Sequence, residues 1–176
     1  STYNSQAYGI FNETRGTINI VNGSVSSNSI HSSAYGVGND GSGTINVIDG
    51  VITCNSNDNY SYGIYNANAG IVNLKGGLVS CHTNEYTGYS GTYGIYNKKA
   101  GIINMTRGNV NSNSEYDAYG IYNKSIGTII VAGGQINSSS RNDSYGICNY
   151  STGTITIIGG GIISSNSSDT SDSSTY

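Results

Sequence analysis

The sequence contains no proline, no tryptophan and one phenylalanine in 176 residues, and only 10% of its residues are charged. Typical soluble domains carry about 25% charged residues. The net charge of −3 gives no reason to expect a nucleic acid or an anionic membrane as a partner. No run of about 18 apolar residues occurs, so the sequence predicts no membrane insertion. The opening STYNSQA lacks the basic and apolar segments of a signal peptide.

Residues that could perform chemistry are also scarce. A catalytic site needs titratable groups that converge in space, but the charged residues are scattered, as Glu13 and Arg15 illustrate. The two histidines, His31 and His82, have no partner that recurs along the chain. No calcium-binding motif of the G-G-x-G-x-D type is present. We therefore expect a protein that is not an enzyme and that uses no metal and no cofactor.

The sequence is dominated by a repeat. The pentapeptide YGIYN stands at 62–66, 93–97 and 119–123, and looser copies begin at residues 8, 35 and 145. The intervals between the leading tyrosines are 27, 27, 31, 26 and 26 residues. In each copy a glycine follows the asparagine by four residues, and another follows by seven more. Such a period indicates stacked units, each too small to bury its own core.

Each repeat holds three short segments with aliphatic residues at equivalent positions. In the second segment Ile18, Ile45 and Val72 begin one column, and polar residues mostly fill the alternate positions. This period of two predicts strands. In the third segment the expected inward column comprises Val25, Ile52, Val79, Val110, Ile136 and Ile162.

Three short strands in every repeat predict an all-β fold: a right-handed, three-sided parallel β-helix of about six turns, each of 26–31 residues. The absence of proline fits strands that hydrogen-bond on both edges. We expect residues 1–176 to form one solenoid array, with repeats starting at 8, 35, 62, 93, 119 and 145. Because Tyr176 falls where a seventh repeat would begin, the chain is interpreted as a segment of a longer array or as a unit that stacks end to end.

Two columns of the pentapeptide are candidate functional features. The final asparagines are expected to stack at a corner, where their amides can form a ladder: Asn12, Asn39, Asn66, Asn97, Asn123 and Asn149. The leading tyrosines are also expected to stack. The fourth position is expected to face outward and to form an aromatic contact strip: Phe11, Tyr65, Tyr96 and Tyr122. Such a strip could contact another copy of the protein or sugar rings, or it could be a solvated stack.

A third candidate is the outer face of the second segment. A flat lattice of threonine and asparagine side chains could bind ice, although Ile71, Ile102 and Ile130 interrupt it. The candidate lattice residues are Thr17, Asn19, Thr44, Asn46, Thr128, Thr154 and Thr156.

The cysteines leave the redox compartment open. Cys54 and Cys81 occupy the same column in adjacent repeats, and the other repeats carry serine there. Sequence does not determine whether a disulfide could form across turns, and two buried free thiols are the favoured interpretation. Cys148 has no evident partner.

The units YGIYNKKAGIINMTRGNVNSNS and YGIYNKSIGTIIVAGGQINSSS resemble the repeats of large bacterial surface proteins with adhesin-like parallel β-helix stalks. This resemblance covers nearly the whole chain and implies an extracellular or cell-surface location. It favours a non-catalytic structural or adhesive fibre segment that self-associates end to end or side by side. Ice binding through the threonine and asparagine face and glycan binding through the tyrosine strip are the alternatives. The candidate partners besides another copy of the chain are glycans or a host surface.

Overall fold

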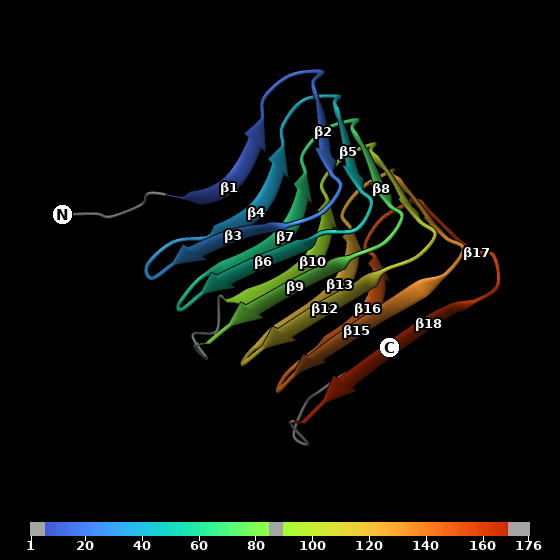
Figure 1. Cartoon of the computed structure of the whole chain (residues 1–176). Helices are drawn as coiled ribbons and strands as arrows, with labels where there is room; N and C mark the ends of the chain where they lie inside the picture. Colours follow the sequence, from blue (N-terminus) through green and yellow to red (C-terminus); the bar gives the residue numbers. More distant parts are fainter. Residues whose placement is uncertain (1–5, 85–89, 169–176) are drawn as a thin grey trace.

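The computed structural model describes residues 6–84 and 90–168, which form six turns of a parallel β-helix (Figure 1). Each turn contributes one strand to each of three six-stranded sheets, and every strand pairs in parallel with its equivalent one turn away. The coil is right-handed (Figure 1), as parallel strand–crossover–strand connections almost always are. The predicted fold class is therefore confirmed.

The three sheets run the length of the coil. Each turn begins with its strand in the first sheet, and the turns are numbered from the N-terminus. The first sheet contains β1 (Ala7–Asn12), β4 (Ala34–Asn39), β7 (Tyr60–Asn66), β10 (Gly91–Asn97), β13 (Asp117–Asn123) and β16 (Ser144–Asn149). The second contains β2 (Thr17–Ile20), β5 (Thr44–Val47), β8 (Ile71–Leu74), β11 (Ile102–Met105), β14 (Thr128–Val131) and β17 (Thr154–Ile157). The third contains β3 (Ser24–Ser29), β6 (Val51–Ser56), β9 (Leu78–Thr83), β12 (Asn109–Ser114), β15 (Gly134–Ser140) and β18 (Gly161–Ser167).

Equivalent residues of successive turns lie directly above one another. Ile18 pairs with Ile45, and Ile45 pairs with Val72, in the register that the repeat predicts. The aliphatic columns of all three sheets meet in one central core. Since each apolar side chain is covered by its copies above and below, side chains of the inner turns such as Ile45 are fully buried.

The glycine of the pentapeptide faces this core, together with the aliphatic residue that follows it. Strict alternation along the strand would place the glycine outside, but a Cβ at Gly63 would overlap the Val79 side chain and lie 2.5 Å from the carbonyl oxygen of Gly94. The strand therefore turns two consecutive residues inward. As a result the tyrosines before and after this pair, Tyr62 and Tyr65, share the outer face.

One predicted core residue is wrong. Ile162 pairs with Gln135 and is 57% exposed, whereas Ile163 pairs with Ile136 and packs against the core. The sixth turn contains one extra residue before β18. Gly159 and Gly160 accommodate it with φ values of 61° and 64°, a conformation that glycine adopts at little cost. The glycine that opens the third segment is therefore Gly161, and Ser165 rather than Ser164 joins the cysteine and serine column.

Apart from the extra residue of the sixth turn, the repeats differ in length at the corner between the third sheet and the next strand of the first sheet. Residues 85–89, in the longest of these corners, lie outside the described residues, as do residues 1–5 and Tyr176, which the sequence places at a repeat start. Across the described ranges, no helix is long and apolar enough to cross a membrane.

Candidate functional surfaces

The predicted asparagine ladder is present at the corner between the first and second sheets. Each side-chain amide except that of Asn149 donates to the side-chain oxygen of the equivalent asparagine one turn further on, over 2.8–3.0 Å. The same nitrogen also donates to the carbonyl of the glycine four residues later in its own turn, over 2.7–3.2 Å. The four inner asparagines are fully buried. Both amide hydrogens are thus satisfied away from water, which makes the ladder a structural element.

This ladder has a direction. The donor is always the asparagine nearer the N-terminus, so the chain of amides runs from Asn12 to Asn149. Among the described residues none donates to Oδ1 of Asn12. At the other end, the Asn149 amide donates only to the carbonyls of its own turn, those of Ser151 and Gly153. A further turn with the same sequence pattern could extend the ladder at either end in the same sense.

The tyrosines that lead the pentapeptides form a continuous stack on the outer face of the first sheet. Ring centroids are 4.5–5.2 Å apart and adjacent ring planes are within 15° of parallel. The stack comprises Tyr8, Tyr35, Tyr62, Tyr93, Tyr119 and Tyr145. Its stacking was expected from the sequence and is confirmed.

The predicted contact strip lies beside this stack. Tyr65, Tyr96 and Tyr122 stack on one another at 5.3–5.4 Å and make edge contacts of 5.0–5.4 Å with the leading tyrosines. Phe11 is separated from them by one turn, because Gly38 occupies the equivalent position there. The strip is therefore one of two adjacent aromatic columns on this face. The sequence did not predict that the two columns adjoin, because strict alternation places the first and fourth residues of the pentapeptide on opposite faces of the strand.

The aromatic surface exposes little of the rings in its inner turns, whereas Tyr8 and Phe11 of the first turn are exposed. Tyr96 is only 7% exposed, since rings above, below and beside it cover its faces. Burial raises the pKa of Tyr35 and of Tyr122 to about 12, with smaller contributions from neighbouring tyrosines for Tyr35 and from Cys148 and Tyr150 for Tyr122. Sugars bind aromatic residues mainly through ring faces, and at stacking distances of about 5 Å no sugar fits between the rings. The geometry thus favours a structural role for most of this surface.

The candidate ice-binding residues lie on the outer face of the second sheet. Thr17 pairs with Thr44, and Thr128 pairs with Thr154, but Ile71 and Ile102 separate the two pairs. The asparagines of this face donate to one another over 2.8–2.9 Å, from Asn104 back through Asn73 and Asn46 to Asn19. Their amides are thus engaged with each other, and Ile130 ends the row. Thr156 continues the same column beyond Ile130 in the last turn.

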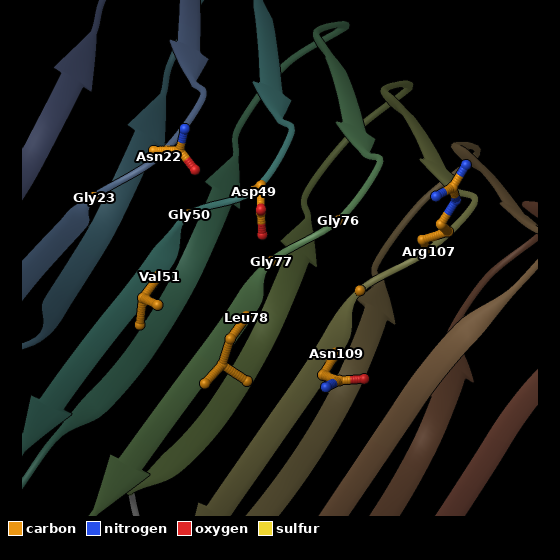
Figure 2. Close-up of a pocket in the computed structure, with 11 residues that line it drawn as sticks. Asn22, Gly23, Asp49, Gly50, Val51, Gly76, Gly77, Leu78, Arg107 and Asn109 are labelled. Carbon is orange, nitrogen blue, oxygen red and sulfur yellow. The ribbon is translucent and has the colours of Figure 1, made fainter.

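A shallow groove follows the corner between the second and third sheets (Figure 2). Its floor is formed by glycine backbone from successive turns, including Gly50, Gly77 and Gly108. The charged side chains of Asp49 and Arg107 lie along it on different turns (Figure 2). The sequence did not predict this groove. It offers a polar backbone surface and two separated charges, without the converging groups of a catalytic site.

The charged side chains otherwise lie mainly at corners. Neighbouring turns are joined by an ion pair of Arg141 Nε with Glu115 Oε2 at 2.7 Å and by a contact of His31 Nδ1 with Asp58 Oδ2 at 3.1 Å. Because all four groups are partly exposed, each pair adds little stability. In residues 6–84 and 90–168 no three histidine, cysteine or acidic side chains gather as a metal site would require.

Comparison of the chain with protein-family models, with curated proteins and with solved structures finds no match in any of the three. Any functional proposal therefore rests on the repeat and on the surfaces described above.

Proposed function

We propose that the chain is a non-catalytic structural or adhesive segment of an extracellular fibre or stalk at a cell surface. The observation that carries this proposal is the directional asparagine ladder, because its two ends complement each other. A further turn, whether from the same chain or from a second copy, can add to either end in register. The three parallel sheets, whose outermost strands belong to the first and sixth turns, can be extended in the same way.

The lateral surfaces suit such a rod. With few charges and many serine, threonine and asparagine side chains, they expose uncharged polar groups that hydrogen-bond between turns. The stacked tyrosine rings, whose centroids are 4.5–5.2 Å apart, pack each turn against the next. The adhesin-like resemblance of the repeats points to the same role, with the variable corners as the contact regions for a host surface or for neighbouring rods.

The proposal is tested by imaging the purified chain at high concentration in the electron microscope. We expect filaments in which the rods are joined end to end, with an axial spacing of about 4.8 Å in fibre diffraction. Head-to-tail contacts of one kind generate open filaments when their rotation does not close a ring, and stacking along the axis of a straight coil closes none. Compact monomers alone, at every concentration tried, would contradict the proposal.

A charge at the end of the core provides the matching variant. Ile157 belongs to an inward column but is 53% exposed because it lies in the sixth turn. Ile157→Lys should shorten or abolish the filaments, since lysine at the end of the core prevents another turn from covering it. Ile126→Lys adds the same charge at a corner position that is 63% exposed and should leave the filaments unchanged.

The two alternatives have weaker support. Ice binding needs an unbroken lattice, and the threonine column is interrupted for two turns by Ile71 and Ile102. Glycan binding through the aromatic strip needs free ring faces, which the stacking covers. Thermal hysteresis in a solution of the chain would support ice binding, and binding to a glycan array would support glycan binding.

A further inference from the structure

Two cysteines lie one above the other in the core. Cys54 of β6 pairs in register with Cys81 of β9, so the second and third turns present their thiols at the same place. Both side chains are buried, with exposed fractions of 0% and 2%. Cα atoms of register-paired residues on neighbouring strands are about 4.8 Å apart, which falls within the range of about 4.4–6.8 Å that disulfides span.

The rest of this column shows what the site normally holds. The equivalent residues are Ser27, Ser112, Ser138 and Ser165. The Ser27 hydroxyl donates to the carbonyl of Ala7 over 2.8 Å, whereas the buried Ser112 hydroxyl has no hydrogen-bond partner. A serine thus folds at this position, even where it is unsatisfied. Replacing either cysteine by serine therefore gives a variant that matches the other turns.

The thiols also lack an alternative role. They lie among aliphatic side chains of the core cluster, and no group of metal-binding side chains surrounds them in the described part of the chain. Burial raises the pKa of the Cys54 thiol well above its ordinary value, and the neighbouring Cys81 raises it further. Because both side chains are buried, an oxidant can reach the thiols only when the third turn opens or has not yet formed.

We propose that Cys54 and Cys81 are an oxidation site at which a disulfide joins the second and third turns of the coil. The oxidant is a small-molecule disulfide such as oxidised glutathione. One cysteine thiolate attacks it and releases one thiol, and the second cysteine thiolate then attacks the mixed disulfide and releases the other. Two protein thiols are oxidised to one disulfide while one small disulfide is reduced to two thiols. The proposal does not depend on fibre formation.

The bond would close a ring that contains one complete turn, because the two cysteines are 27 residues apart in the sequence. Constraining an unfolded chain over a ring of this size is expected to lower the equilibrium constant for unfolding by about a hundredfold or more. By linkage, the equilibrium constant for forming the disulfide should be larger in the folded coil than in the unfolded chain by the same factor.

The test measures the disulfide equilibrium in glutathione redox buffers, with and without urea, in a Cys148→Ser background that removes other pairings. Thiols are counted by alkylation and mass spectrometry, and the bond is located by peptide mapping. We expect half of the Cys54–Cys81 disulfide to be reduced at a certain value of the glutathione ratio, which is the square of the reduced glutathione concentration divided by the oxidised glutathione concentration. This value should be about a hundredfold higher for the folded protein than for the protein in urea. The oxidised form should also have a higher urea midpoint than the reduced form.

Two outcomes would overturn the proposal. In the first, the disulfide is no more stable in the folded protein than in urea, which would mean that the native coil does not accommodate it. In the second, the folded protein retains two free thiols in oxidising buffer. Cys54→Ser and Cys81→Ser are the controls: each should fold, and neither should change its urea midpoint with redox conditions.

Discussion

The buried asparagine ladder allows a quantitative prediction for its central member, Asn66. Its side chain accepts from the Asn39 amide at 3.0 Å and donates to Asn97 Oδ1 and to the Gly70 carbonyl, both at 2.9 Å. Asn66→Ala removes all three hydrogen bonds. Each is worth about 1 kcal/mol net, and the buried acceptors that lose their donor add a further cost. We expect a loss of about 3–5 kcal/mol in the free energy of unfolding.

The exposed ladder on the second sheet supplies a control within the same turn. Asn73 donates to Asn46 at 2.8 Å and accepts from Asn104 at 2.9 Å, but it is only half-buried. Water can replace both hydrogen bonds in Asn73→Ala, so the expected loss is about 1 kcal/mol or less. The two substitutions are chemically identical and differ in burial.

Thermal and urea unfolding followed by circular dichroism measure the difference. At about 2–4 °C per kcal/mol for a chain of this size, Asn66→Ala should melt about 5–15 °C below Asn73→Ala. Amide hydrogen exchange in the second to fourth turns should rise in Asn66→Ala alone. Equal melting temperatures for the two variants would refute the reasoning, because burial of the ladder would then contribute nothing.

Three further predictions concern the tyrosines, the core glycine and the sixth turn. Because the pKa values of Tyr35 and Tyr122 are raised to about 12 in the folded state, their contribution to stability is complete below pH 10 and is lost as the pH rises from about 10 to 12. Unfolding and phenolate absorbance, both followed at alkaline pH, should therefore change in one joint transition, and phenolate titration near pH 10 without unfolding would contradict this prediction. Gly63→Ala should destabilise the protein by about 1–3 kcal/mol in urea unfolding, since its Cβ would overlap core atoms, and a stability equal to that of the parent would show that the core can yield there. Ile163→Ala should lower the free energy of unfolding by about 2 kcal/mol and Ile162→Ala by less than about 0.5 kcal/mol. The reverse order would show that Ile162 lies in the core, as the sequence spacing predicts.

Most of the fold follows from the repeat because a solenoid places residues one period apart directly above one another. The tyrosine, aliphatic and asparagine columns could therefore be predicted from spacing alone, and all are present. The asparagine ladder was predictable as a column, but its direction and the second hydrogen bond of each amide depend on the backbone of the following corner.

Two features could not be read from spacing. In the sixth turn three consecutive glycines, 159–161, leave the start of the third segment ambiguous. Packing decides it, because only Ile163 reaches the core beside Gly146. In the pentapeptide, alternation predicts that the glycine faces outward. The structure turns it inward because the third sheet approaches too closely for a side chain.

The sequence by itself determined the number of turns, the three-sided plan and the vertical stacking of like residues, since all of these follow from a period and from alternation within short strands. Only the tertiary structure decided which atoms meet between the sheets. It brought both tyrosine columns to one face, where the rings of one column contact the edges of the other. That outcome depends on how closely the third sheet approaches the first within each turn, because this close approach turns the pentapeptide glycine inward, and a repeat pattern carries no information about the distance between sheets.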